Sequence, residues 1–219
     1  MGTPFPGSSR RRITLIAWIV ALVALVVVMA LNTKVLTAEE AASVNPDKFD
    51  AAVYAADAFP GIVEGVTDAA IDIVGVAQPV LDDPSAAGAE YGNIAGTDKY
   101  AISLKATGAV AEADENFLVL AVDGMPAGTE VRVALAQAVN GTALRDALGD
   151  IAFKDFRNQT DYQQVANEFK TLAIAAIADE VDPAALLGKR VTVTGVFVTK
   201  TGPAGSFIIS PVSVIEVTE

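Results

Sequence analysis

Residues 189–200 read "KRVTVTGVFVTK", and this stretch decides the fold that the sequence predicts. Its β-branched and aromatic residues, uninterrupted by proline, are typical of a β-strand. Gly195 stands within the run, where the lack of a side chain lets a strand coil sharply. A second strand pattern, "SFIISPVSVIEV" at 206–217, follows the short loop 201–205. The end of the chain is therefore predicted to be a strand pair of the kind found in small barrels.

Three further strand patterns come before this pair. The sequence "KYAISLKATGAV" at 99–110 alternates larger apolar residues with small or polar ones. The run "ENFLVLAV" at 115–122 is continuously apolar after its first two residues, which is typical of a central strand, and "TEVRVALAQAV" at 129–139 alternates again. The sequence therefore predicts five strands, three of them in succession.

A helix is predicted between the third and fourth strands. An apolar stripe at helical spacing covers about 160–180, and Thr160 with Gln163 forms a capping box in front of it. Three strands, a helix and two strands is the order of an OB-fold, a five-stranded Greek-key barrel. We therefore expect an α+β protein in which residues 91–219 form an OB-like barrel with a long helix between strands 3 and 4. An α+β sandwich with an open sheet would use the same elements.

Residues 32–90 are expected to form a linker and a helical layer. Asn45 and Pro46 suit the cap and first position of a helix, and Pro60 with Gly61 is expected to end it. A second helix is expected from about residue 62 to the Asp-Asp-Pro sequence at 82–84.

The N-terminal residues predict a membrane anchor. Residues 13–31 contain one polar residue, Thr14, and would span roughly 28 Å as a helix, close to the thickness of a bilayer core. Three arginines in the basic segment 1–12 place that end in the cytoplasm. We expect an uncleaved signal-anchor crossing the inner (plasma) membrane once, with the C-terminal domain extracytoplasmic. A cleaved signal peptide is the alternative.

Composition excludes several functions. The chain has no Cys and no His, so thiolate metal sites, Cys nucleophiles and His-based triads are ruled out. Four of the 15 basic residues and none of the 27 acidic ones fall within residues 1–34, so the remainder carries a net charge of −16. Such a body repels nucleic acid. We expect no catalytic residues, no metal, no cofactor and no nucleic-acid partner.

The most polar passage is "GTALRDALGDIAFKDFRNQ" at 141–159. Its candidate residues for binding a ligand or partner are Thr142, Arg145, Asp146, Asp155, Asn158 and Gln159. A guanidinium fork, carboxylates and amides beside aromatic rings suit a small polar ligand such as a sugar.

The same passage also fits a structural brace, which is the interpretation we favour. Thr142 would cap a short helix, and Arg145 would form an ion pair with Asp146 or Asp155. Asn158 and Gln159 would satisfy backbone groups ahead of the long helix. The phenylalanines at 153 and 156 are then expected to plug the end of the barrel.

The chain resembles the DUF2291 family, bacterial proteins described as predicted periplasmic lipoproteins. The resemblance rests on "GTALRDALGDIAFKDFRNQTDYQQVANEF", "LLGKRVTVTGVFV", "IISPVSVIEV" and "YGN" at 91–93, and it covers about residues 33–217. It implies an OB-like fold, an extracytoplasmic location and genes that often lie beside those of sugar ABC transporters. It implies no catalytic residue. The chain departs from the family description because an apolar anchor stands where a lipidated Cys would be.

Together these observations predict a membrane-anchored, extracytoplasmic and non-catalytic binding or accessory protein. Its partners would be the membrane, through residues 13–31, and an ABC transporter component or a small polar ligand. The alternative function is a structural module of the cell envelope that binds another protein.

Overall fold

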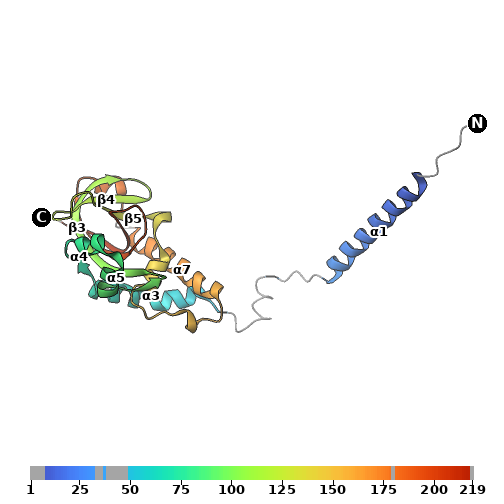
Figure 1. Cartoon of the computed structure of the whole chain (residues 1–219), viewed down its shortest axis with the longest axis horizontal. Coiled ribbons are helices and arrows are strands. Elements are labelled where there is room, and N and C mark those ends of the chain that lie inside the picture. Colours follow the sequence, from blue (N-terminus) through green and yellow to red (C-terminus); the bar gives the residue numbers. More distant parts are fainter. Residues whose placement is uncertain (1–7, 33–36, 38–48, 179–180, 218–219) are drawn as a thin grey trace, which may run out of the picture. The chain divides into compact units, whose positions relative to one another are not determined.

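The computed structural model describes residues 8–32, 37, 49–178 and 181–217. The chain divides into two compact units, Met1–Lys48 and Phe49–Glu219 (Figure 1). The first unit contains the helix α1 (Ser8–Asn32), in which every described side chain from residue 15 to residue 31 is exposed. The helix itself was expected. In the described parts of the chain, however, no helix combines the length and apolar character needed to cross a membrane.

The second unit is built on one mixed sheet. Its strands are β1 (Ile71–Asp72), β2 (Asn93–Gly96), β3 (Lys99–Ala113), β4 (Phe117–Ala121), β5 (Glu130–Ala134), β6 (Arg190–Val198) and β7 (Ser206–Glu216). Pairing runs from β3 to β4, β5, β7 and β6, and β6 pairs with β3 again. The contact between β5 and β7 is parallel and the other pairings in this circuit are antiparallel. The predicted α+β class is confirmed, and each of the five predicted segments forms a strand, but the sheet has seven strands rather than five because β1 and β2 also pair with β3.

Gly195 has the role that its position in the sequence suggested. The register between β6 and β7 shifts between Thr194 and Gly195, so the strand bends there. A Cβ atom at Gly195 would lie 2.4 Å from the carbonyl oxygen of Ser210 on the neighbouring strand. Only glycine allows the two strands to approach so closely.

Two hydrophobic clusters lie on opposite faces of the sheet. One fills the inside of the circuit with side chains such as Leu104, Val133 and Phe207. The other lies between the outer face and the helices, and Ala101 and Val196 belong to it. Because both faces of β3 are covered, residues 101–104 are all buried although the sequence alternates in polarity.

The helical layer differs from the prediction at Pro60. The helix α3 (Ala51–Asp68) continues through this proline, whereas the sequence was expected to break there. Proline removes one backbone hydrogen bond. Phe59 and Ile62, on either side of the proline, are buried and hold the helix against its neighbours. Asp50 caps the helix; the expected cap at 45–46 lies outside the described residues.

The predicted second helix, from about residue 62 to the Asp-Asp-Pro sequence at 82–84, is divided between the end of α3, the strand β1 and the helix α4 (Ile73–Asp82). A further helix, α5 (Pro84–Tyr91), follows it. The Asp-Asp-Pro sequence ends α4 as expected, and the Asp83 carboxylate also caps α5 by accepting the N–H groups of Ser85 and Ala86. The helix α5 was not predicted because it has no apolar stripe.

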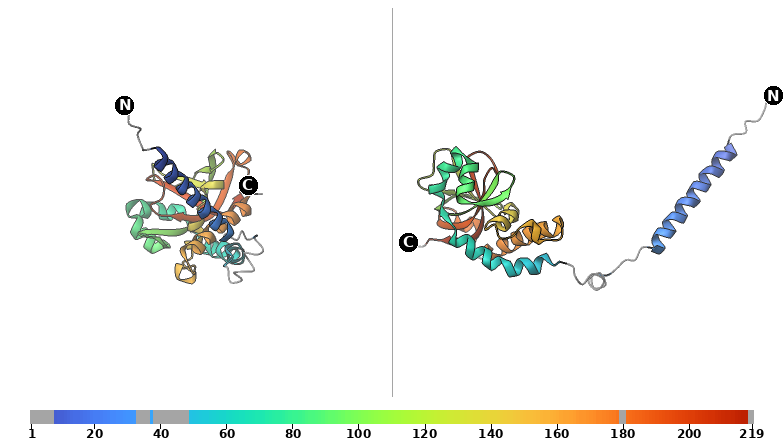
Figure 2. Two further views of the ribbon diagram at one scale, coloured as in Figure 1. Left: turned by 90° about the vertical axis from the view of Figure 1, so that its right-hand side faces the viewer. Right: turned by 60° about the horizontal axis from the view of Figure 1, so that its bottom comes forward.

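The remaining helices follow β5. They are the short turns η1 (Ala136–Ala138) and η2 (Phe153–Asp155), and the helices α6 (Gly141–Asp146), α7 (Gln159–Ile177) and α8 (Pro183–Leu186). Figure 2 shows α3 and α7, coloured cyan and orange, side by side. The predicted long helix is confirmed, but its cap is Asn158, whose side chain accepts the N–H of Asp161. The expected capping box at Thr160 is wrong.

Candidate functional site

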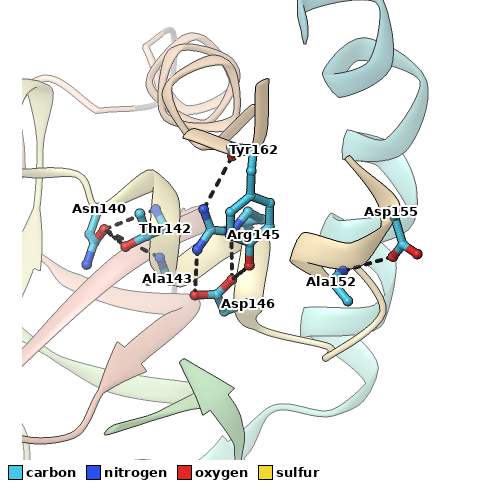
Figure 3. A network of polar contacts seen from close by, with 8 residues as sticks. All are labelled: Asn140, Thr142, Ala143, Arg145, Asp146, Ala152, Asp155 and Tyr162. Carbon is cyan, nitrogen blue, oxygen red and sulfur yellow. Dashed lines mark hydrogen bonds and ion pairs between the residues drawn. The ribbon is translucent and has the colours of Figure 1, made fainter. Parts of the chain in front are cut away.

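The predicted polar cluster contains a closed network between α6 and α7. The Nε and Nη2 atoms of Arg145 donate to the two carboxylate oxygens of Asp146 at 2.7 and 3.0 Å. Its Nη1 donates to the backbone oxygen of Tyr162 at 3.3 Å, and its guanidinium lies 3.5 Å from the centre of the Tyr162 ring. The Tyr162 hydroxyl donates back to Asp146 at 3.2 Å (Figure 3). The three side chains therefore use their polar groups on one another.

Because the network is buried, it contributes to the stability of the fold. Arg145 and Asp146 are 7% and 6% exposed, so each charge would be costly to hold there without the other. Burial raises the pKa of the Tyr162 phenol, and the Asp146 carboxylate raises that pKa further. The phenol therefore stays protonated at neutral pH and can donate its hydrogen bond. What the arrangement does chemically is join α6 to α7.

The start of α6 is fixed by a residue that the sequence reading missed. Asn140, and not Thr142, is the cap: its side-chain oxygen accepts the N–H of Thr142 at 3.0 Å and that of Ala143 at 3.4 Å. The Thr142 hydroxyl donates to the same oxygen. The backbone N–H of Asn140 donates to the Ser210 hydroxyl on β7 at 2.9 Å. An Asn before Gly-Thr was the available signal, because Asn is among the strongest N-caps.

The other three candidate residues lie away from Arg145. The Asp155 carboxylate accepts the N–H of Ala152 at 3.1 Å in the loop before α7 (Figure 3). Asn158 caps α7 and donates to Asp161, and Gln159 is the first, exposed residue of that helix. The six candidates thus form two separate groups, one on α6 and one at the start of α7. The binding role predicted for them stays a prediction.

The two phenylalanines of the passage do not plug the barrel. Phe156 makes ring contacts with Phe49, Tyr54 and Tyr162, and Phe153, which is half exposed, contacts Tyr162. None of these residues belongs to the cluster inside the strand circuit. The prediction failed because α7 packs against α3, on the outer face of the sheet, and carries these rings with it.

A second charged cluster was not foreseen. The Lys200 ammonium donates to the Ser85 hydroxyl at 2.6 Å and pairs with the Asp98 carboxylate. The hydrogen bond from Lys200 is the main cause that lowers the pKa of Asp98. A lysine held as an ammonium by a carboxylate cannot take the proton of Ser85, so this Ser-Lys pair is not arranged as a nucleophile and base. More than 100 residues separate Lys200 from both partners, and no local pattern could reveal the contact.

Among the described residues, no group of three or more His, Cys, Asp or Glu side chains is arranged to hold a metal ion. Several of the described acids serve as helix or turn caps, as Asp50, Asp83 and Asp114 do.

Comparison with known proteins agrees with this geometry. The model of the family DUF2291, described as predicted periplasmic lipoprotein, matches residues 21–215. The chain belongs to the DUF2291 family. An OB-fold protein from Thermotoga maritima, known from its crystal structure, is similar to this DUF2291 protein with a TM-score of 0.60 and 17% sequence identity. The similarity covers 78% of this chain and 99% of the other, and at this identity it shows the fold alone. No curated protein matches the chain.

Family membership indicates a cellular location but no biochemical activity. The description names a periplasmic lipoprotein, yet the 219 residues contain no Cys to carry a lipid. The DUF2291 protein is therefore extracytoplasmic by its family, and its mode of attachment has to be argued from its own residues.

Proposed function

We propose that this DUF2291 protein is a non-catalytic accessory module held at the outer face of the cytoplasmic membrane by a single-pass anchor at residues 13–31. The observation that carries the proposal is the surface of α1. Large apolar side chains cover it on every side from Leu15 to Leu31, with Trp18 72% exposed. A helix that is apolar all round needs an apolar environment.

The charge distribution supports the same orientation. Residues 10–12 are arginines, and the positive side of an anchor stays in the cytoplasm. The unit Phe49–Glu219 lies within the strongly acidic remainder of the chain. An acidic domain tethered outside the membrane suits a protein or small-molecule partner better than nucleic acid.

The non-catalytic part of the proposal is supported by the two charged clusters. The Arg145 network uses its donors internally, and Lys200 is paired with Asp98. The family resemblance is the reason for including a sugar ABC transporter as the partner. The exposed candidate residues for contact with it are Thr142, Asp155, Asn158 and Gln159, whereas Arg145 and Asp146 are buried and join α6 to α7. A structural envelope module is the alternative that the same surface would serve.

Membrane fractionation tests the anchor. The full chain is expected to stay in the membrane fraction through high salt and alkaline carbonate, and protease added outside is expected to digest residues 49–219. In the control variant, Leu22→Lys with Val26→Lys, the apolar face is broken at its centre, and release into the wash is expected because a charge there is costly. Recovery of the unchanged chain in the wash would contradict the anchor.

Photo-cross-linking in cells tests the accessory role. A photo-reactive amino acid at Gln159 is expected to cross-link a permease or substrate-binding subunit of a sugar transporter, and one at Glu64 on α3 is expected not to. Cross-links from Gln159 to an unrelated envelope protein would favour the structural alternative, and equal labelling from both positions would argue against either.

A further inference from the structure

An open apolar groove of about 290 Å³ lies beside the end of β5 and the C-terminal half of α7, with Val181 and Pro183 also lining it. Its apolar wall includes Leu135, Ile174, Ile177 and Val181, and Glu115 is the acidic residue among the described residues that line it. An apolar cavity of about 150 Å³ is large enough for benzene. This groove, called the Glu115 pocket below, has room for an aromatic ring with a short aliphatic arm.

The backbone that forms the pocket is held in place. Ala136, in its wall, has a φ of +43°, in the left-handed region that alanine rarely occupies. The preceding residue, Leu135, donates its N–H to the carbonyl oxygen of Asn116 at 2.6 Å. Residues in such a conformation persist where the surrounding structure fixes them, and they concentrate at binding sites.

Hydrogen bonds also fix the turn that carries Glu115. The Asp114 carboxylate accepts the N–H groups of Asn116 and Phe117 at 2.7 and 2.8 Å. The turn is therefore ordered on both sides of Glu115. The Glu115 carboxylate itself has no hydrogen bond and no ion pair within the part of the chain that the structure describes, which sets it apart from Asp114 and Asp155. Among the described residues, the rim of the groove thus has an exposed carboxylate with no partner, carried by a turn whose backbone is fixed.

We propose that the Glu115 pocket binds a small apolar molecule that carries one ammonium group. The hydrocarbon part would displace water from the groove, and the ammonium would donate to the Glu115 carboxylate. The excess of acidic residues in this unit attracts cations and repels carboxylates at longer range. The pocket is separate from the Arg145 network, and the proposal does not depend on the membrane anchor.

Three probes with one body and three head groups test the proposal. Phenylpropylamine, phenylpropanol and phenylpropionate are titrated calorimetrically into the full chain in zwitterionic lipid nanodiscs, with empty nanodiscs as the blank. The amine is expected to bind about fivefold more tightly than the alcohol, the gain of one solvent-accessible ion pair, and the carboxylate is expected to bind most weakly.

Variants identify the site. Glu115→Gln is expected to remove the preference for the amine and leave alcohol binding unchanged, while the matched control Glu64→Gln on α3 keeps the preference. Ile174→Trp is expected to fill the groove and abolish binding of all three probes; Ala178→Leu replaces it if the tryptophan variant loses its near-ultraviolet circular dichroism. Equal binding of amine and alcohol, no binding by any probe, or unchanged binding in the folded filled variants would each overturn the proposal.

Discussion

The ion pairs Arg145–Asp146 and Lys200–Asp98 both have hydrogen-bonding contacts between their charged groups, but they differ in how far they are exposed to solvent. In the Arg145–Asp146 pair the side chains are 8% and 7% exposed, and Tyr162 covers both. In the Lys200–Asp98 pair they are 35% and 57% exposed. Contact alone therefore says little about what each pair contributes to stability.

The difference lies in what happens when one partner is removed. A charge left behind in a buried site has lost its water as well as its partner. A charge left at the surface is simply solvated, and its pair is worth little to begin with. The comparison predicts a hierarchy of effects, from the centre of the α6–α7 contact outward to the surface.

The largest effect is expected at Arg145. Arg145→Met leaves the Asp146 carboxylate buried without its cation, and should lower the free energy of unfolding by about 3–5 kcal/mol. Urea unfolding, followed by the near-ultraviolet circular dichroism of the four tyrosines, measures the change.

A double variant separates a brace from a binding site. Arg145→Met with Asp146→Leu removes both charges, so it should recover most of the lost stability. If Arg145→Met changes stability by less than about 1 kcal/mol, the size expected of an exposed pair, then the network is not a brace, and the binding role predicted for Arg145 and Asp146 becomes the better explanation.

The second effect concerns how closely α6 approaches α7. A Cβ atom at Gly141 would lie 1.8 Å from the backbone oxygen of Ala166 on α7. Gly141→Ala should therefore destabilise by about 1–3 kcal/mol, the range for overpacking. Gly61→Ala is the matched control, because nothing lies within 4 Å of a Cβ there and alanine should stabilise the helix by roughly 0.5–1 kcal/mol. A neutral Gly141→Ala would mean that α6 can move away from α7 without cost.

The strands and the Arg145–Asp146 pair also show which features the sequence could predict. The strands were found because β-branched runs such as 189–200 carry their signal locally, and Gly195 marked the bend. Arg145 with Asp146 was a visible pair because the residues are neighbours. Tyr162 was not assigned to it, since its role depends on how α6 packs against α7.

Other features failed for the same physical reason. Pro60 is a helix breaker in isolation, and tertiary packing around Phe59 and Ile62 overrides it. The Lys200 cluster and the Glu115 pocket join segments that are far apart in the chain, so no spacing rule reveals them. Local propensity predicted most elements; contacts between distant elements decided what the polar residues do.

A smaller effect is expected at the start of α7. The sequence predicts a capping box at Thr160, whereas the structure has Asn158 as the cap. Asn158→Ala removes the acceptor for the N–H of Asp161 and should cost on the order of 1 kcal/mol. Thr160→Ala should not lower the unfolding free energy, because Thr160 is an exposed residue inside the helix and alanine favours the helix slightly over threonine. A larger loss of stability from Thr160→Ala than from Asn158→Ala would support the capping box at Thr160 and a helix that starts there.

The smallest effect on stability is expected at Lys200, where a substitution should change the pKa of Asp98 more clearly than the stability of the fold. Lys200→Met removes the main cause that lowers the pKa of Asp98, so that pKa should rise toward its ordinary value, as a carboxyl NMR titration would show. The urea midpoint at neutral pH should fall only slightly, because the pair is exposed. A lowered carboxyl pKa favours the folded state above the ordinary pKa and loses this contribution as pH falls through the lowered one, so any small difference between the two proteins is present at neutral pH and disappears at acidic pH. A fall in stability at neutral pH as large as that of Arg145→Met would show that exposure does not separate the two pairs.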